Sequence, residues 1–385
     1  MLIIKGCSPE ILIKDSKIAE MADDIPVTGD MTVIDATGLV VAPGLVDIHV
    51  HFREPGFEYK EDILTGSAAA AAGGVTTSCC MPNTLPVNDS KEITEYIINK
   101  ASHAAITVLP IGAVTEGQKG EKLTDFPALK EAGVVALSDD GMPVQSDNVM
   151  RKALQSAREL DMLIISHCEE EASMVERDVK LAAGLNTGVH IAHVSTAEAV
   201  DTIRKAKKAG VKVTAETCPH YFSLTEAAVA EKGTNARMSP PLRTEKDVEA
   251  IILGLCDGTI DAIATDHAPH SVDEKSLPFT KAPNGIIGLE TLLAVTLTYL
   301  YHTGRLKLDE IINLMTIKPA EILGLDAGRL VKGGTADIVI FDPNEEWTVD
   351  AAEFKSKARN TPFDGMKLRG KVKYTISRGV VVYRG

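Results

Sequence analysis

Residues 189–214 read VHIAHVSTAEAVDTIRKAKKAGVKVT, and this stretch predicts a strand, a helix and a second strand in succession. The apolar run 189–192 is typical of a short buried strand. The helical pattern 196–209, rich in Ala and Lys, is followed by Gly210, the residue type that most often ends a helix. Two apolar strands connected by a helix lie parallel in one sheet that is buried on both faces.

The same unit recurs along the chain between residues 43 and 334. Apolar runs return about every 25–35 residues, with helical patterns between them. Eight such units predict an α/β fold of the (β/α)8, TIM-like barrel type. The alternative is an open, doubly wound sheet, but no Gly-rich phosphate loop follows the first run. The predicted strands are 45–48, 75–78, 106–109, 134–137, 163–166, 189–192, 211–214 and 260–264.

Both ends of the chain show strand patterns without helices. The first part contains short apolar runs at 2–4, 11–13 and 32–35, and the last part contains runs at 336–341 and 375–382. Neither end is long enough to bury a core by itself. We therefore predict a composite β-sandwich domain formed by residues 1–42 and 335–385, and a barrel domain formed by residues 43–334.

The composition is that of an ordinary globular protein. Apolar residues make up 44% of the chain, charged residues 24%, and the net charge is −14. This acidic balance argues against nucleic acid or an anionic membrane as a partner. No apolar run approaches the roughly 18–20 residues that span a bilayer, and residues 1–5 do not resemble a signal peptide. The six cysteines show no CxxC spacing, which predicts free thiols and a cytoplasmic location.

Polar residues follow the predicted barrel strands at the end where barrel enzymes carry their chemistry. His49 and His51 are two residues apart, so their side chains share one face of an extended strand. Six metal-binding side chains exceed the four ligands of one tetrahedral zinc, which predicts two metals that share a carboxylate. Asp140 is the expected bridge, because it lies between the two histidine pairs in barrel order. The six are His49, His51, Asp140, His167, His193 and Asp266.

The other histidines are less suited to metal binding. His190 lies inside a predicted strand, where a histidine is usually a satisfied core residue. His220 follows a strand and is a candidate for the pocket wall. We expect His267 to point away from Asp266, whereas His270 lies in a loop that can fold over the pocket.

These motifs carry a resemblance to a known family. Residues 43–56, PGLVDIHVHFREPG, resemble the opening signature of dihydroorotases in the amidohydrolase superfamily, and the likeness is greatest to the type I enzymes. Further motifs follow in the same order and extend the resemblance to residues 334–337. They are CMPNT at 80–84, SDDG at 138–141, HCEE at 167–170, HVST at 193–196 and DHAPH at 266–270.

The resemblance implies a zinc enzyme that interconverts N-carbamoyl-L-aspartate and L-dihydroorotate in de novo pyrimidine (UMP) biosynthesis. One or two Zn²⁺ ions would lower the pKa of a bound water from about 15.7 towards 7 and polarise the ring carbonyl. Asp266 would be the general base, and Arg53 would bind the substrate carboxylate, which a guanidinium fork suits better than an ammonium. The substrate-binding residues implied in this way are Arg53, Asn83, Ser239, His270, Asn284 and Gly285.

The chain departs from its relatives at two places. Ser239 stands where they commonly have asparagine, and a serine can still donate to substrate through water. The connection 171–186, between His167 and His193, is more compact than in many relatives, which affects contacts between subunits but not the metal ligands. The resemblance otherwise implies a homodimer and a possible complex with aspartate transcarbamoylase.

Two other functions fit parts of the pattern. Hydantoinases and allantoinases share the barrel and the HxH motif with this chain. They resemble one another in a further feature, a carboxylated lysine at the end of the fourth strand. Here that strand ends in residues 137–141, LSDDG, without a lysine. A noncatalytic subunit that scaffolds aspartate transcarbamoylase would have lost metal ligands, and this chain has lost none. We therefore expect an active dihydroorotase, with another cyclic amidase or a scaffold as the alternatives.

Overall fold

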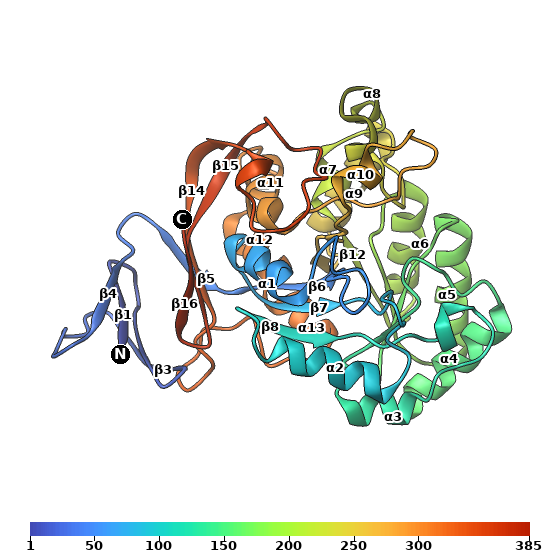
Figure 1. The fold of residues 1–385 in the computed structure, drawn as a ribbon, viewed down its shortest axis with the longest axis horizontal. Coiled ribbons are helices and arrows are strands. Elements are labelled where there is room, and N and C mark those ends of the chain that lie inside the picture. Colours follow the sequence, from blue (N-terminus) through green and yellow to red (C-terminus); the bar gives the residue numbers. More distant parts are fainter.

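The computed structural model describes residues 1–385 and confirms the predicted (β/α)8 barrel with a small β-sandwich beside it (Figure 1). Each of the eight predicted barrel strands is present, with its bounds shifted by a few residues. The strands are β6 (Leu45–Val50), β7 (Val75–Cys80), β8 (Thr107–Pro110), β9 (Leu137–Ser138), β10 (Ile164–Ser166), β11 (Val189–Ile191), β12 (Val213–Thr217) and β13 (Ala262–Ile263).

The barrel closes from two parallel arcs. Strands β6 to β8 form one arc and β9 to β13 form the other. Single parallel bridges, Gly112 to Leu137 and Val50 to His267, join the arcs at their two seams. Apolar side chains of modest size, such as Val46, Ile165 and Ala264, fill the interior. The centre of the barrel is therefore a packed core, and the space for chemistry lies at the carboxyl ends of the strands.

Helices surround the barrel and cover its apolar outer face. Thr196 caps the start of α6 by accepting a hydrogen bond from the Ala199 amide, and Gly210 follows the helix with a left-handed φ of 79°. This confirms the helix and the stop predicted there. The longer helices are α1 (Ile63–Ala72), α2 (Lys91–Ala101), α3 (Phe126–Ala132), α4 (Asp147–Glu159), α5 (Glu171–Leu185), α6 (Ala197–Lys208), α9 (Glu245–Cys256), α12 (Leu308–Leu314) and α13 (Ile317–Ile322). Shorter helical segments are α7 (Pro219–Ser223), α8 (Ala228–Lys232), α10 (Val272–Lys275), α11 (Leu292–Thr296), η1 (Glu116–Gln118), η2 (Gly233–Ala236), η3 (Leu289–Thr291), η4 (Leu297–Tyr301) and η5 (Ala351–Glu353).

The β-sandwich combines the two ends of the chain (Figure 1). In its second sheet, Val40 of the first part pairs antiparallel with Phe341 of the last part. Ile338 and Ile340 pack against the first sheet, whereas Val339 and Phe341 belong to the core shared with the barrel. This sheet is thus buried on both faces. The first sheet has the order β3 (Lys17–Ala22), β2 (Glu10–Lys14), β1 (Leu2–Lys5), β4 (Thr32–Asp35), and the second β16 (Val380–Arg384), β15 (Lys367–Ser377), β14 (Ile338–Thr348), β5 (Val40–Pro43).

The strand prediction at the chain ends missed β5 and was wrong in two further details. The run 375–382 is not one strand, because the chain turns at Arg378 and Gly379, whose φ angles of 50° and 77° are left-handed. The edge strand β3 was not predicted, since its sequence KIAEMA has little β-branched character. Between β14 and β15, residues 349–366 leave the sheet and extend over the barrel towards α10 (Figure 1).

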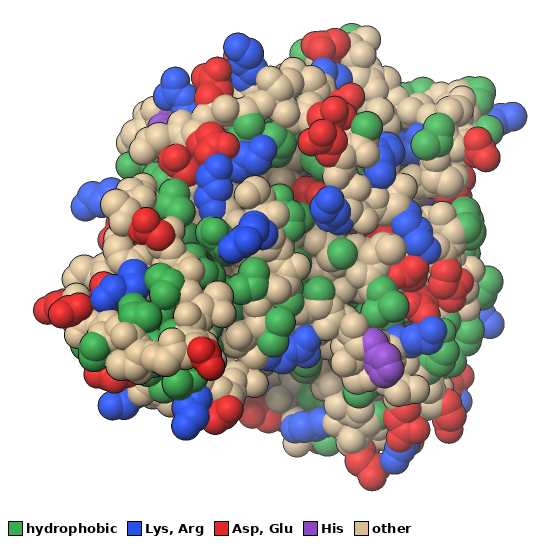
Figure 2. Space-filling model, turned by 60° about the vertical axis from the view of Figure 1, so that its left-hand side comes forward, with side chains coloured by type: hydrophobic (Ala, Val, Ile, Leu, Met, Phe, Trp, Pro, Cys, Tyr) green, Lys and Arg blue, Asp and Glu red, His purple; other side chains and the backbone are tan.

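The surface shows no dominant charge on the face in Figure 2, where basic and acidic side chains are interspersed. All six cysteines are free thiols, as predicted. None of the helices combines the length and apolar character that crossing a membrane requires.

Candidate metal centre and substrate pocket

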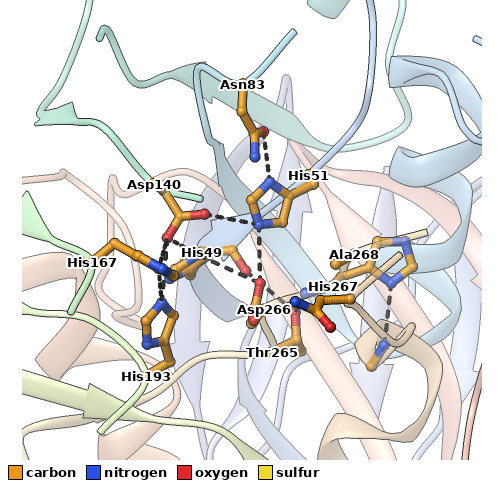
Figure 3. A network of polar contacts seen from close by, with 12 residues as sticks. His49, His51, Asn83, Asp140, His167, His193, Thr265, Asp266, His267 and Ala268 are labelled. Atoms are coloured by element: carbon orange, nitrogen blue, oxygen red, sulfur yellow. Dashed lines mark hydrogen bonds and ion pairs between the residues drawn. The ribbon is translucent and has the colours of Figure 1, made fainter. Parts of the chain in front are cut away.

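The six predicted metal-binding residues meet at one end of the barrel (Figure 3). His49 is part of β6, and His51 follows the same strand directly. The other four follow β9, β10, β11 and β13, so five separate strands contribute to one cluster. All six side chains are buried. The members outside β6 are Asp140, His167, His193 and Asp266.

Asp140 lies between the two histidine pairs, where the prediction placed it. Its Oδ1 is 3.3 Å from His49 Nε2, 3.1 Å from His167 Nδ1 and 3.4 Å from His193 Nε2. Its Oδ2 is 3.4 Å from His51 Nε2. Asp266 Oδ1 is 3.0 Å from His51 Nε2 and 3.6 Å from His49 Nε2. Ligands about 2.0–2.1 Å from a tetrahedral zinc are about 3.3 Å apart, so these separations suit metal binding.

Neighbouring side chains fix the orientation of the two β6 histidines. His49 Nδ1 is 2.6 Å from Glu216 Oε1, and His51 Nδ1 is 2.8 Å from Asn83 Oδ1. When both Nδ1 atoms donate to these oxygens, the lone pair of each Nε2 faces the two aspartates. The buried His49 Nε2 has no hydrogen-bond partner, as expected for a nitrogen that a metal can bind. Imidazole nitrogens and carboxylate oxygens in this arrangement fit one or two zinc ions.

Glu216 contacts the cluster and is a residue of the site that the sequence analysis missed. It is fully buried in β12, and its second oxygen is 3.4 Å from His190 Nε2. Burial raises the pKa of this carboxyl, but the His49 and His190 imidazoles outweigh that effect and lower it to about 2. Glu216 is therefore ionised at neutral pH. The predicted strand ended at Thr214, two residues before Glu216, so this acidic side chain went unnoticed.

Three residues of the site have a left-handed backbone. The φ angles are 63° for Arg53, 35° for His193 and 48° for Asp266. This conformation is unfavourable for residues with a side chain, and it is concentrated where function fixes the direction of a side chain. Here it redirects each side chain as its strand ends.

A cavity of about 200 Å³ opens beside the metal-binding cluster. All six predicted substrate-binding residues line it. Arg53 is 9% exposed, and its Nε donates to the carbonyl of Pro269 at 3.1 Å. Burial lowers the pKa of Arg53 to about 10, so the guanidinium stays charged at neutral pH. The lining residues are His51, Arg53, Asn83, Asp140, Gly141, His167, Glu169, Ser239, Asp266, Ala268, His270, Asn284 and Gly285.

Hydrogen bonds within the protein already involve two of the predicted substrate-binding residues, His270 and Gly285. His270 Nε2 donates to the Asn284 carbonyl at 2.7 Å, and its Nδ1 is 3.4 Å from Lys60 Nζ. Burial, together with the charges of Arg53 and Lys60, lowers the pKa of His270 to about 3, so its ring is neutral. The Gly285 amide donates to another backbone carbonyl, and its own carbonyl accepts from two side chains. Gly285 therefore shapes the cavity wall, and its backbone has no free donor for a substrate.

The remaining histidines lie outside the cluster. His190 is a core residue outside the cluster: its Nδ1 is 2.8 Å from Thr214 Oγ1, and its Nε2 has no hydrogen-bond partner and faces Glu216 Oε2 at 3.4 Å. His220 is buried and does not line the cavity. His267 Nε2 lies 3.6 Å from Glu61 Oε2, which turns it away from the metal-binding cluster, as expected.

A (β/α)8 barrel with histidines and aspartates gathered at the strand ends defines a class, that of the metal-dependent hydrolases built on this fold. The sequence model of the amidohydrolase family matches residues 40–382. The chain belongs to the amidohydrolase family.

Similar proteins indicate which group within this family the chain resembles. It is 50% identical to a dihydroorotase from Citrifermentans bemidjiense over 403 residues, covering 97% of this chain and 95% of that protein. It is 49% identical to a dihydroorotase from Acetivibrio thermocellus, covering 97% of this chain and 94% of that one. Among solved structures, the L-hydantoinase from Arthrobacter aurescens superimposes with a TM-score of 0.89 at 27% identity, covering 100% of this chain and 96% of that one. The predicted resemblance to dihydroorotases is confirmed.

Proposed function

We propose that the protein is a zinc-dependent dihydroorotase, which reversibly closes N-carbamoyl-L-aspartate to L-dihydroorotate and water in de novo pyrimidine biosynthesis. One observation carries the proposal. The cavity is lined by four of the clustered residues, His51, Asp140, His167 and Asp266, and a buried, charged arginine, Arg53, lies on its wall. A cyclic amide with a carboxylate on its ring needs both features, whereas a plain hydantoin ring needs only the first. The relatives at 49–50% identity support the same assignment.

The metal ligands would be the six clustered residues, with Asp140 as the bridge if two ions bind. When bound, zinc supplies a water of lowered pKa and polarises the ring carbonyl. Glu216 and Asn83 hold His49 and His51 in the tautomer that binding requires. The oxygen of Asn83 is used in this way, which leaves its amide hydrogens for the substrate.

Asp266 would move the proton of the reaction. Burial raises the pKa of its carboxyl, but without metal the charges of protonated His49 and His51, together with the hydrogen bond from His51 Nε2, outweigh burial and hold that pKa well below its usual value. A bound metal would supply the positive charge in place of the Nε2 protons. The ionised carboxylate lines the cavity. It can take a proton from the attacking water and pass it to the ring nitrogen that departs. In ring closure the same proton moves in the opposite direction.

The other end of the substrate would be held away from the metals. Arg53 offers its terminal nitrogens to the ring carboxylate, while its Nε is fixed on Pro269 and its Nη2 lies 3.4 Å from His270 Nε2. Ser239 and Asn284 also line this part of the cavity. Gly285 contributes space, because an added Cβ would lie 2.8 Å from the Cβ of Ala268.

A second candidate is another cyclic amidase, which the similarity to the L-hydantoinase structure favours. Against it, no lysine lines the cavity, so the carboxylated lysine expected of that group has no counterpart here. The predicted homodimer, the complex with aspartate transcarbamoylase and the cytoplasmic location stay predictions.

Turnover of dihydroorotate, hydantoin and allantoin by one preparation tests the proposal, with the metal content per chain determined on the same sample. Dihydroorotate should be the preferred substrate by orders of magnitude. Ring closure takes up one proton, so the equilibrium should shift about tenfold towards closure per unit fall in pH. Preferred turnover of hydantoin or allantoin would replace the proposal by the second candidate, and metal binding without any turnover would favour a scaffold.

A further inference from the structure

The substrate pocket includes walls that are held by a segment from the far end of the chain. Residues 355–361, here called the strap, lie in the excursion between β14 and β15. Glu290 accepts hydrogen bonds from the Lys355 and Ser356 amides at 2.9 and 3.1 Å. Glu61 accepts from the Ser356 hydroxyl and from the Lys357 amide. Two carboxylates of the barrel therefore fix the course of the strap.

Asn360 is the residue at which the strap reaches the pocket walls. Asn360 is 3% exposed, and its side chain uses both amide hydrogens and its oxygen in hydrogen bonds to two loops. Nδ2 donates to the Ala268 carbonyl at 3.1 Å and to the Gly285 carbonyl at 3.0 Å. Oδ1 accepts from the His270 amide at 3.1 Å, and the Asn360 carbonyl accepts from the Ile287 amide at 2.9 Å.

The two loops joined in this way carry the part of the pocket opposite the metals. Loop 268–270 contributes Ala268 and His270, and it also presents the Pro269 carbonyl that anchors Arg53 Nε. Loop 284–287 contributes Asn284 and Gly285. Neither loop contains a metal ligand. A change at Asn360 therefore acts on the Arg53 end of the cavity without a direct contact to the metal-binding cluster.

Loops 268–270 and 284–287 are closely packed where they meet, which leaves little room for movement. Gly285 has a left-handed φ of 134°, and a Cβ there would lie 2.8 Å from Ala268 and 3.0 Å from His270 Nε2. The buried Lys275 Nζ donates to the same Gly285 carbonyl at 2.9 Å from the other side. Asn360 and Lys275 thus hold the Gly285 carbonyl between them. The two loops also meet directly, because the Ala268 amide donates to the Ile286 carbonyl at 2.8 Å and His270 Nε2 donates to the Asn284 carbonyl at 2.7 Å. Asn360 adds a further link, in which one side chain contacts Ala268, His270 and Gly285.

We propose that Asn360 is a positioning residue that sets the carboxylate-binding end of the substrate pocket by clamping loops 268–270 and 284–287 together. A carboxamide is needed because one group must donate twice and accept once. Aspartate has the same shape but cannot donate to the two carbonyls, and it places a negative charge beside them. The pocket-setting role rests on the proposed function, since it concerns the end of the cavity that would bind a ring carboxylate.

The experiment compares the metal-loaded wild type with Asn360→Asp and with Thr375→Val. Thr375 is a matched control: it is also buried in the last part of the chain, and its hydroxyl donates to the Ala71 carbonyl, away from the pocket. Asn360→Asp should raise KM for dihydroorotate about 10- to 100-fold, leave kcat within about threefold and keep wild-type metal content. Thr375→Val should lower the melting temperature without changing KM.

Amide hydrogen exchange over residues 268–287 gives a readout that does not depend on the substrate. Exchange there should be faster in Asn360→Asp and unchanged in Thr375→Val. If the wild type does not turn over dihydroorotate, the proposed function is wrong. Hydrogen exchange still shows whether Asn360 clamps the loops, and KM is then compared with hydantoin or allantoin, whichever the wild type turns over. Should Asn360→Asp not fold, Asn360→Ala takes its place. Wild-type KM, a loss confined to kcat, or unchanged exchange would each overturn the clamp.

Discussion

Replacing Arg53 by lysine tests the proposed recognition of the substrate carboxylate most directly. The guanidinium is buried, charged and fixed at one nitrogen on the Pro269 carbonyl. Lysine keeps the charge but loses this anchor, worth about 1 kcal/mol, and one of the two bonds of the fork, worth about 2 kcal/mol for a charged pair. The sum of about 3 kcal/mol corresponds to a loss of roughly 150-fold in kcat/KM.

The loss should fall mainly on KM, because the carboxylate is not the group that reacts and is bound equally in the ground and transition states. Steady-state kinetics with dihydroorotate, on samples matched for metal content, provide the measurement. Arg305→Lys is the control, since Arg305 pairs with Glu249 at 2.9 and 2.8 Å on the surface and is 43% exposed. Its kcat/KM should equal that of the wild type. An Arg53→Lys enzyme with wild-type kcat/KM would show that the guanidinium does not bind the substrate.

Three further predictions concern the metal site and stability. His193→Ala should lower the amount of bound metal and reduce turnover by orders of magnitude. Asp266→Asn should keep most of the metal and lose turnover. Both variants are assayed for turnover and metal content, and full activity of either one would contradict the role assigned to that residue. Glu216→Gln should weaken metal binding about 10- to 100-fold in a metal-buffer titration, because His49 loses its charged acceptor, and unchanged affinity would remove that function. Burial raises the pKa of Glu290 from 4.5 to about 7, so its contribution to stability is complete below pH 4.5 and is lost as the pH rises through 7. Between pH 5 and 8 the free energy of unfolding of the wild type should therefore fall by up to about 2 kcal/mol relative to Glu290→Gln, and parallel pH profiles in urea denaturation would refute this.

The barrel was predictable because its signals are local. Each strand is an apolar run of a few residues, and a helix that ends at a glycine such as Gly210 marks the return to the sheet. The meeting of His49 with Asp140 and His193 was predictable in turn, because the carboxyl ends of parallel barrel strands share one rim. The short edge strand β3 gave no such signal, since it forms only through pairing with β2.

The residues that support the site were not predictable in the same way. Asn360 is separated by 92 residues from Ala268 and by 75 from Gly285, so no pattern in its own neighbourhood indicates those contacts. Glu216 had a recognisable signal, a carboxylate inside a buried strand, which requires a partner. Glu216 lies two residues after the predicted run 211–214, so a search of the positions after this seventh run, as was made for the other strands, would have found it.

The pairing of β5 with β14 determines which parts of the protein can complete their fold during synthesis. Roughly 300 residues separate the two strands, and at about 5–20 residues per second a ribosome needs about 15 to 60 s to make them. During that time the nascent chain carries β5 with an unpaired edge, which is open to association with other chains. The barrel strands emerge before the sheet that packs on their helices is complete, and the strap emerges after all of them. The pocket therefore reaches its final shape only after the strap has been made, so a chain interrupted before residue 355 can contain all six residues of the cluster and still lack a complete pocket.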